Sequence, residues 1–265
     1  YDTILRFSNA SGDAHEADTC QDSRGFAMKV LGVPGPKLLE SDKDAMTQDF
    51  VMLNYPFFFA NDSMKYMDAV AKNMSDSRLQ KMTIPLTLGL KGTLIAKKVS
   101  TGRIANPFQV QYYSAVPYQL GVGEERLAVK YSLKPESDQR DPIPGQAEDN
   151  YLQQAIKSSL AQGEVRLKLL VQPKVTEEQD VENSMVAWEE DEAPFHEIAT
   201  LSIPPQNVDS EEVKKLGERL SFNPWHSLAE HRPLGSINRT RKVVYERISR
   251  VRNQNNKVPR EEPIH

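Results

Sequence analysis

Two arginines and one tyrosine in the last part of the chain have a spacing that could support metal chemistry. Arg241 precedes Tyr245 by four residues, and Arg252 follows Tyr245 by seven. A helix has about 3.6 residues per turn, so these three side chains would lie on one stripe. The aliphatic residues of the same stripe are Ile237, Val244 and Ile248. Because guanidinium groups among aliphatic side chains must be neutralised, the stripe predicts a charged partner or ligand.

The tyrosine of this stripe could bind a metal as its anion. A phenol is neutral at about pH 7 unless a nearby cation stabilises its charged form. Arg241, one helical turn before Tyr245, would supply that cation, and phenolate is one of the few protein ligands of haem iron. Arg252 could then form a bidentate pair with a haem propionate. On spacing alone, an amphipathic helix with an exposed tyrosine is the more frequent outcome.

The N-terminal part of the chain contains a series of motifs in a characteristic order. Residues 6–8 (Arg-Phe-Ser) are followed by residues 17–19 (Ala-Asp-Thr) and 22–29 (Asp-Ser-Arg-Gly-Phe-Ala-Met-Lys). This order is similar to that of the haem catalases. In that family an arginine on a strand precedes an Asp-Thr-x-x-Asp-x-Arg-Gly-Phe-Ala-x-Lys hairpin.

Further motifs follow in the order that the same family has. Residues 54–62 (Asn-Tyr-Pro-Phe-Phe-Phe-Ala-Asn-Asp) resemble the catalase Asn-x-Pro-x-Phe-Phe-x-x-Asp segment. Tyr66 falls where catalases place an aromatic residue above the haem. Residues 222–224 (Phe-Asn-Pro) and 241–245 are similar to the Phe-x-Pro and proximal Arg-x-x-x-Tyr elements. The chain therefore resembles the haem catalase superfamily, in particular its small catalase-related, peroxidase-like branch.

The resemblance, which extends from Arg6 to Arg252, implies a b-type haem as the cofactor. Tyr245 would be the axial ligand of the iron, with Arg241 holding it as phenolate, and this electron-donating ligand would favour ferric iron. Arg6 and Arg252 would pair with the two haem propionates, because carboxylates in a low-dielectric pocket need charged partners.

Two further residues would face the haem by the same resemblance. Asn54 would lie on the distal side and donate a hydrogen bond to bound peroxide, although Leu53 competes for the matching position. Tyr66 would pack on the porphyrin face. Without the resemblance, plain structural roles compete for each residue: Asn54 as a turn residue at a strand end, Tyr66 as helix core, and Arg6 as a surface charge at a sheet edge.

The implied activity is that of a haem peroxidase or catalase-like oxidoreductase. Ferric haem would cleave the O–O bond of hydrogen peroxide or of an organic hydroperoxide, and the small size of the chain favours peroxidase turnover. Related enzymes of the allene oxide synthase type instead rearrange fatty-acid hydroperoxides into epoxides, and the sequence leaves both activities open. A non-catalytic haem carrier and a haem-free binding barrel are the competing classes.

The distal histidine of catalases has no counterpart in the sequence. Catalases carry this residue upstream of the Arg-Phe-Ser strand, where it moves the proton across the O–O bond. Only five residues precede Arg6. The histidines of the chain lie elsewhere, at His15, His196, His226, His231 and His265. Because the chain opens on Tyr1 inside a predicted strand, we expect the natural N-terminus, with the distal histidine, to lie upstream.

The length and composition fit a globular protein, and the resemblance implies a single catalase-like haem domain over residues 1–265. The net charge of −4 and a pI of about 5.8 argue against nucleic acid as the main partner. The sequence has no run of eighteen apolar residues that could span a membrane. The single Cys20 excludes an internal disulfide and favours a reducing compartment such as the cytoplasm without establishing it. The expected partners are a peroxide substrate and other copies of the chain in a homo-oligomer.

Charge is unevenly distributed along the chain. Residues 177–192 are acidic and predict a solvated loop between two strands. Residues 232–260 are strongly basic, but the predicted stripe accounts for two of these arginines. Other cations of the same predicted helix fit an ordinary solvent-exposed helix face better than a binding site for a polyanion. These cations are Arg239, Lys242, Arg247 and Arg250.

Short apolar runs predict about eight antiparallel strands. The predicted strands cover residues 4–9, 26–31, 50–53, 56–60, 108–115, 127–133, 165–171 and 198–203. Helices are predicted near residues 63–73, 151–162, 211–220 and 236–253, mostly after capping residues such as Asp62, Asn150 and Ser210. Strands with helices packed outside them indicate an α+β fold, built on a closed antiparallel β-barrel.

Other kinds of site are disfavoured by the sequence. Trp225-His226 and His231 could suggest a metal pair, but a hydrogen-bonded loop histidine is the more frequent outcome. Asp22 and Arg24 predict a pair that stabilises the N-terminal hairpin. Neither a Gly-rich phosphate loop nor a nucleophile elbow occurs in the sequence.

Overall fold

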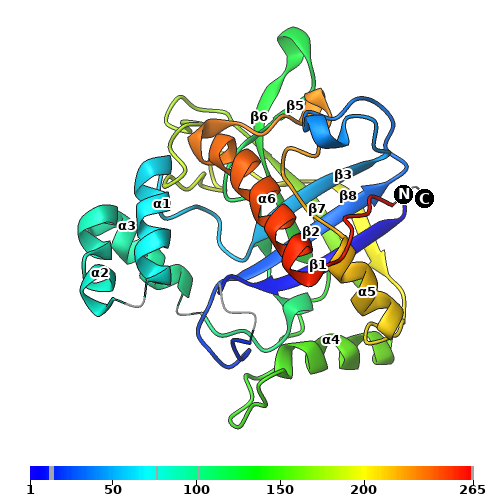
Figure 1. Ribbon diagram of the computed structural model, residues 1–265. Coiled ribbons are helices and arrows are strands. Elements are labelled where there is room, and N and C mark those ends of the chain that lie inside the picture. Colours follow the sequence, from blue (N-terminus) through cyan, green and yellow to red (C-terminus); the bar gives the residue numbers. More distant parts are fainter. Residues whose placement is uncertain (12–14, 76, 101, 264–265) are drawn as a thin grey trace.

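The computed structural model describes residues 1–11, 15–75, 77–100 and 102–263, and an eight-stranded antiparallel sheet forms the centre of this part of the chain (Figure 1). The strand order is β1-β2-β3-β4-β6-β7-β8, and β5 pairs with β6 beside this path. The strands are β1 (Thr3–Asn9), β2 (Arg24–Leu31), β3 (Thr47–Leu53), β4 (Tyr112–Tyr113), β5 (Tyr118–Leu120), β6 (Leu127–Pro135), β7 (Val165–Pro173) and β8 (His196–Ile203).

The sheet curls into a half-barrel that does not close, so the predicted closed barrel is wrong, whereas the α+β class is confirmed. Its two end strands, β1 and β8, form no ladder with each other within the described ranges. Between β3 and β4 the ladder is reduced to the single pair Leu53–Tyr113, whereas β6 and β7 pair over seven positions. Strand β4 has only two residues, so the sheet is narrowest at its middle and open between β1 and β8.

Aromatic side chains from neighbouring strands form the centre of the hydrophobic core. The rings of Phe26 and Tyr112 lie 5.3 Å apart, and Phe7 packs edge-on against Phe26 at the same separation. Val129 and Tyr131 on β6 belong to the same core. They are two residues apart because alternate residues of a strand face the same side. This packing explains why the alternating runs of the sequence form strands.

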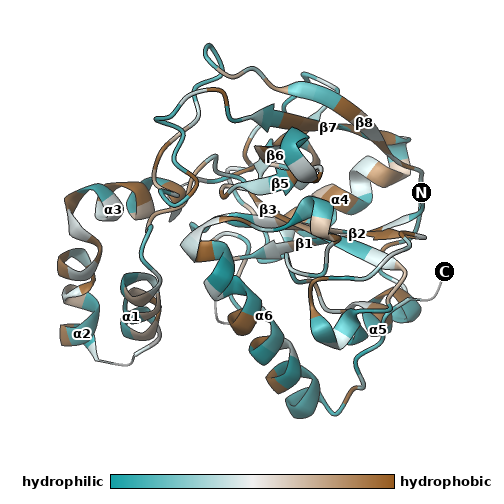
Figure 2. Ribbon diagram, turned by 90° about the horizontal axis from the view of Figure 1, so that it is seen from above, coloured by the Kyte–Doolittle hydropathy of each residue, from teal (hydrophilic) through white to brown (hydrophobic). Residues whose placement is uncertain are grey.

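Six α-helices lie outside the sheet in the described chain. They are α1 (Ser63–Met74), α2 (Arg78–Met82), α3 (Ile84–Ser100), α4 (Tyr151–Gln162), α5 (Glu211–Arg219) and α6 (Gly235–Asn256). Helix α6 crosses the sheet region, whereas α1, α2 and α3 project together to one side, as two views show (Figures 1 and 2).

Most of the predicted elements are confirmed, and the errors fall where the chain is irregular. The predictions for β1, β2, β3, β6, β7, β8, α1, α4, α5 and α6 hold in position, and the acidic loop connects β7 to β8 as expected. The predicted strand 56–60 is wrong, because residues 54–62 form an irregular segment. The predicted strand 108–115 is largely wrong, because a 3-10 helix at Pro107–Gln109 leaves only the two residues of β4.

Helices α2 and α3 are not predicted by the sequence pattern. Helix α2 has only five residues, which is too short for a periodic signal. Helix α3 contains Pro85 near its start and is interrupted at Gly89, which has a non-helical φ of +70°. Pro85 and Gly89 interrupt the helical spacing of the apolar residues, so the sequence pattern does not indicate one continuous helix.

Helix caps agree with the sequence in part. Asp62 and Ser210 cap α1 and α5 by accepting hydrogen bonds from backbone N–H groups. The Asn150 side chain does not cap α4, contrary to expectation. Instead Asp18, in the N-terminal loop, accepts a hydrogen bond from the Leu152 backbone N–H at 3.0 Å. The loop between β1 and β2 is therefore attached to a helix far away in the sequence.

The predicted Asp22–Arg24 pair is replaced by two separate sets of contacts. Asp22 accepts hydrogen bonds from the backbone N–H groups of Ala10 and Ser11, at 2.6 and 2.7 Å. Arg24 donates to the Cys20 carbonyl oxygen at 2.9 Å. Both residues brace the N-terminal loop, but they do so through the backbone.

A buried polar network attaches the C-terminal segment to the sheet. His226 is fully buried, with Nδ1 2.8 Å from Asp42 Oδ2 and Nε2 2.6 Å from Thr47 Oγ1. Arg260 donates a short hydrogen bond to the same Asp42 oxygen, and Glu262 accepts one from Thr47 Oγ1 at 3.1 Å. His226 is thus a hydrogen-bonded histidine of the interior, as the sequence favoured.

A buried lysine completes this network. Lys29 Nζ lies 2.7 Å from Asp49 Oδ1 and 2.9 Å from Glu262 Oε2. Burial opposes the charge of Lys29, but the two carboxylates outweigh burial and raise the pKa of its amine. The C-terminal segment therefore supplies a carboxylate, from Glu262, that a buried cation of β2 needs.

Gly235, the first residue of α6, is expected not to tolerate a side chain. Its φ of +83° disfavours other residues, and an added Cβ would overlap the Val181 carbonyl oxygen. We expect Gly235→Ala to lower the free energy of unfolding by roughly 2 kcal/mol in urea denaturation. The control is Gly217→Ala in α5, where no atom lies within 4 Å of the added Cβ. That control should stabilise by about 0.5–1 kcal/mol, and equal losses would contradict the explanation.

Asp42 is expected to make stability depend on pH in acid. Burial opposes its charge, but hydrogen bonds from His226 and Arg260 outweigh burial and hold the pKa of the carboxyl well below its usual range. Because the folded-state pKa lies below the unfolded one, this stabilisation is present above pH of about 4 and is lost as the pH falls further.

The variant Asp42→Asn tests this dependence by urea denaturation over a pH series. We expect a loss of roughly 3 kcal/mol at neutral pH, because a member of a buried ion pair is removed. The fall of stability below about pH 4 should also become shallower than in the wild type. Asp44→Asn, at an exposed position of the same segment, should leave both properties unchanged. If the stability of Asp42→Asn fell below about pH 4 as steeply as that of the wild type, the role of this carboxyl would be refuted.

Candidate functional site

Helix α6 brings Arg241 and Tyr245 into contact, as their spacing predicts. Arg241 Nη2 donates a hydrogen bond to the Tyr245 hydroxyl oxygen at 3.3 Å, and the guanidinium carbon lies 5.2 Å from the centre of the phenol ring. Arg241 is buried, whereas Tyr245 is half-buried. Burial alone would lower the pKa of Arg241, but the neighbouring phenols of Tyr245 and Tyr118 outweigh it and raise that pKa. The guanidinium therefore stays charged beside the tyrosine oxygen.

Asn238, which the sequence analysis does not single out, fixes this arginine in place. Its Oδ1 accepts a hydrogen bond from Arg241 Nη1 at 3.1 Å, and its Nδ2 donates to the Pro117 carbonyl oxygen at 2.9 Å. Trp225 Nε1 donates to the Asn238 carbonyl oxygen at 2.6 Å. The amide is completely buried. Its position three residues before Arg241, on the same helical stripe, is the signal that could have identified it.

Two further phenols surround the guanidinium. Tyr118, on β5, has a buried hydroxyl close to Arg241, and this hydroxyl makes no hydrogen bond of good geometry within the described residues. Tyr66, on α1, packs against Phe58 with ring centres 5.2 Å apart. Burial raises the pKa of Tyr66, the charge of Tyr245 adds to this effect, and Arg241 opposes it. Tyr66 therefore lies beside the Arg241–Tyr245 pair.

Arg6 and Arg252 lie near each other at one side of this group. Arg6 is exposed on the end strand β1, which also fits a surface charge at a sheet edge. The neighbouring protein and the positive charge of Arg252 lower the pKa of Arg6, while Glu218 and Tyr245 act in the opposite direction. The Arg252 guanidinium donates to the carbonyl oxygens of Leu220 and Glu218, at 2.5 and 3.3 Å. Two guanidinium groups that repel each other, close to Tyr245, would suit a ligand with two carboxylates.

Asn54 belongs to a different set of contacts. Its Oδ1 accepts a hydrogen bond from the Arg24 backbone N–H at 2.8 Å, and its own backbone N–H donates to the Arg24 carbonyl oxygen at 3.0 Å. These bonds attach the end of β3 to the start of β2. The structure brings five of the six predicted site residues into one region, and the distal role of Asn54 stays a prediction.

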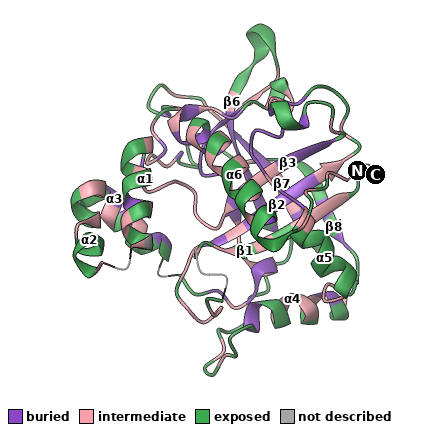
Figure 3. Cartoon of the chain, in the orientation of Figure 1, coloured by how far each residue is buried: buried purple, intermediate pink, exposed green. Residues whose placement is uncertain are grey.

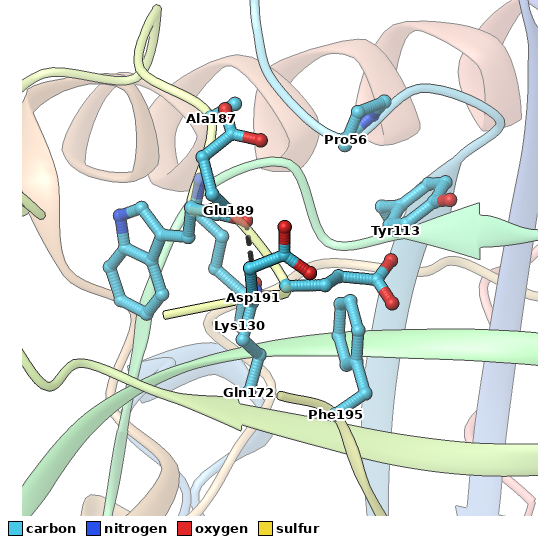
Figure 4. Close-up of a pocket in the computed structure, with 10 residues that line it drawn as sticks. Pro56, Tyr113, Lys130, Gln172, Ala187, Glu189, Asp191 and Phe195 are labelled. Carbon is cyan, nitrogen blue, oxygen red and sulfur yellow. Dashed lines mark hydrogen bonds between the residues drawn. The ribbon is translucent and has the colours of Figure 1, made fainter. Parts of the chain in front are cut away.

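A cavity of about 350 Å³ lies elsewhere, beneath the acidic loop between β7 and β8 (Figure 4). Figure 4 shows Tyr113, Lys130 and Phe195 gathered beside Glu189 and Asp191 of that loop. Burial lowers the pKa of Lys130 to about 8, and its amine donates to a backbone carbonyl oxygen at 3.2 Å. None of the six predicted site residues lines this cavity.

One group of side chains in the described chain has the geometry for a metal ion: Asp42, His226 and Glu262. Its ligand atoms are already engaged, because Arg260 binds Asp42 and Glu262, and Lys29 binds Glu262 at 2.9 Å. Two cations at the same carboxylates would repel an added metal ion. The group is therefore better explained as the network that attaches the C-terminal segment.

Comparison of the sequence with protein families finds one match, to the family described as Catalase, over residues 1–84. A curated relative, the catalase of Latilactobacillus sakei, is 36 % identical over 75 residues. This stretch covers 28 % of the present chain and 13 % of that catalase. The matched region contains the Arg-Phe-Ser, hairpin and Asn-x-Pro motifs.

Comparison of the structure extends the likeness to nearly the whole chain. A fungal catalase matches with a TM-score of 0.75 and 19 % identity, over 96 % of this chain and 52 % of its own. Catalase A from Saccharomyces cerevisiae matches with a TM-score of 0.75 and 19 % identity, over 94 % and 53 %. A bacterial catalase matches with a TM-score of 0.72 and 17 % identity, over 99 % and 52 %.

These matches differ in what they support. The structural likenesses, at such low identity, establish the fold, whereas the family and curated matches rest on the sequence of the N-terminal part. The chain spans about half the length of these catalases of known structure. The first 84 residues thus match the catalase family by sequence, and nearly the whole chain has the fold of the catalases.

Proposed function

We propose that the protein binds a b-type haem through Tyr245 and cleaves the O–O bond of hydrogen peroxide or an organic hydroperoxide. The observation that carries this proposal is the hydrogen bond from the buried Arg241 to the Tyr245 hydroxyl oxygen. This contact occurs on a chain with the catalase fold. A guanidinium that donates to a phenol oxygen favours negative charge on that oxygen, which is the form that binds iron.

The residues around this pair fit a haem in charge and in chemistry. Arg6 and Arg252 offer positive charge where the two propionates would need it. The buried Tyr118 hydroxyl lacks a good hydrogen-bond partner within the described chain, and Tyr66 offers an aromatic face. An orphaned polar atom beside a charged pair is what a ligand would be expected to complete.

Each of these residues would have a distinct task. Tyr245 would hold the iron, Arg241 would keep the proton away from the ligand oxygen, and Asn238 would fix the orientation of Arg241. When bound, ferric haem would supply the redox chemistry of O–O cleavage. Asn54 would orient the substrate by donating from its amide, because its carbonyl oxygen is already engaged with Arg24.

Two related activities stay open beside peroxide reduction. Helices α1–α3 have exposed apolar side chains, and those of α1 lie on the same helix as Tyr66. These side chains favour a bulky fatty-acid hydroperoxide as a second candidate substrate, with rearrangement as the reaction. A haem-binding protein without catalysis is the other alternative. We also propose assembly into a homo-oligomer, as expected from the sequence.

Haem binding through Tyr245 can be tested with one conservative variant. We expect Tyr245→Phe to weaken haem retention at least roughly tenfold, because the ring stays but the ligand oxygen is lost. The measurement is the Soret absorbance after haem reconstitution and gel filtration, with circular dichroism to check folding. The control Arg250→Ala removes an exposed side chain that pairs with Glu246 on the same helix. It should retain haem as the wild type does, and equal losses would contradict the proposal.

The substrate can be chosen by comparing two peroxides on the haem-loaded protein. We expect oxidation of a phenolic reductant by hydrogen peroxide at about three times the rate of free haem, because a charged proximal ligand promotes O–O cleavage. A larger gain is not expected, since the sequence of residues 1–265 has no counterpart of the distal histidine that moves the proton. Conversion of linoleic acid hydroperoxide to an epoxide, followed by mass spectrometry, would instead identify rearrangement. Retained haem with no turnover of either substrate would identify a non-catalytic haem protein.

A further inference from the structure

The helical arm, defined as α1, α2 and α3 (residues 63–100), has an unusual share of exposed apolar side chains. Nineteen large hydrophobic side chains are exposed among the described residues, and seven of them lie between residues 64 and 94. Leu86 is 85 % exposed and Leu90 is 80 % exposed. The seven are Met64, Met67, Leu79, Met82, Leu86, Leu90 and Leu94. Figure 3 shows that most of the arm is exposed, and Figure 2 shows it standing away from the sheet.

These side chains are not the ones that attach the arm to the protein. Ala69 of α1 and Ile95 and Val99 of α3 are buried. Gly92 lies against the irregular segment, where an added Cβ would be 2.8 Å from the Phe59 carbonyl oxygen. The arm therefore has one apolar side that is packed and a second that faces solvent. Exposed apolar side chains gathered in one short part of the chain, rather than scattered singly, mark an interaction site.

The arm is also basic in a protein that is acidic overall. Residues 62–98 contain seven Lys or Arg and three Asp, a net charge of +4, whereas the whole chain has a net charge of −4. Among the described aspartates, Asp62 caps α1 and Asp68 lies 2.5 Å from Lys72. The exposed cations are Lys65, Arg78, Lys81, Lys91, Lys97 and Lys98.

We propose that the helical arm docks on an anionic lipid membrane. Exposed Leu and Met side chains can enter the boundary between headgroups and acyl chains, while neighbouring Lys and Arg contact anionic headgroups. None of the described helices is long and apolar enough to cross a membrane. The kink at Gly89 and the short α2 divide the apolar surface among several short helices, which suits adsorption at the surface.

Other occupants match this surface less well. Two copies of the arm meeting face to face would bring like charges together, which opposes association. A nucleic acid would neutralise the cations but would leave the seven apolar side chains in water. An anionic bilayer covers both features at once, because it presents negative charge above an apolar interior.

The docking surface is continuous with the candidate site. Tyr66 lies beside Arg241 and Tyr245, whereas Met64 and Met67, on the same helix, are exposed. On the proposed function, docking would bring the haem site towards hydroperoxides held in the membrane. The docking itself requires no haem, so it can fail or succeed independently of the catalytic proposal.

Vesicle sedimentation tests the docking with the full chain. Vesicles of phosphatidylcholine alone are compared with vesicles of equal parts phosphatidylcholine and phosphatidylglycerol. We expect binding to the anionic vesicles, weakened by salt because exposed charges are screened. The triple variant Leu86→Ser/Leu90→Ser/Leu94→Ser should lower the partition coefficient roughly tenfold or more. The double variant Lys81→Glu/Lys91→Glu should remove the preference for anionic vesicles.

Matched variants control for general changes of the surface. Val122→Ser/Val175→Ser/Ile198→Ser replaces three exposed aliphatic side chains outside the arm. Lys43→Glu/Lys215→Glu makes the same charge change at exposed positions outside the arm. Both controls should bind anionic vesicles as the wild type does, and circular dichroism checks that all variants fold.

Three outcomes would overturn the proposal. The first is no preference of the wild type for anionic vesicles, and the second is equal loss of binding in the control and arm variants. The third is a concentration-dependent dimer in light scattering that the leucine variant abolishes, because the arm would then bind a second copy of the chain. Haem retention, measured in parallel by the Soret band, keeps a failure of docking distinct from a failure of haem binding.

Discussion

The positive charge of Arg241, removed from water within α6, is the constraint that the candidate site depends on. A buried cation costs several kcal/mol unless polar groups replace its water. Here a phenol and an amide of the same helix do so, and the amide, from Asn238, also donates to the Pro117 carbonyl oxygen before β5. Because the Leu234 backbone N–H donates to the same oxygen at 3.0 Å, the start of α6 is fixed to the sheet by the groups that solvate Arg241.

The protein has a second set of buried charges, and the contrast between the two is informative. Around His226, each carboxylate of Asp42, Asp49 and Glu262 is paired with Lys29 or Arg260 within the chain. At the candidate site the cations are instead hydrogen-bonded to a tyrosine hydroxyl, an amide and backbone carbonyls. A site with an excess of positive charge is prepared for anionic groups, and a saturated one is not. This difference in charge pairing, more than cavity size, is why the Arg241 region is the candidate site and the His226 region a structural network.

The sequence predicts the arrangement of the candidate site better than it predicts the shape of the sheet. Helical periodicity suffices to put Arg241 beside Tyr245, because both belong to one helix and their contact needs no tertiary information. The open sheet follows from the missing ladder between β1 and β8, which no local pattern reveals, and the apolar run from 108 to 115 conceals that β4 has only two residues. Asn238 lies on the predicted stripe, three residues before Arg241, but a polar residue on a helix is usually solvated, and the fold is needed to show that it is buried. The N-cap of α4 is missed for the same reason, since Asp18 reaches it across 134 positions of the chain.

The contacts that attach the helical arm to the protein do not explain the apolar side chains that the arm exposes. Burial of Ile95 and Val99 accounts for its attachment, and Gly92 permits the close approach to the Phe59 carbonyl oxygen. This attachment does not require the exposed leucines of the arm, which lower the solubility of the protein. A surface that is apolar without a structural reason, and basic against the charge of the whole chain, must be explained by what it meets. Since α1 also carries Tyr66, which interacts with Arg241, whatever the arm meets will lie near the candidate site.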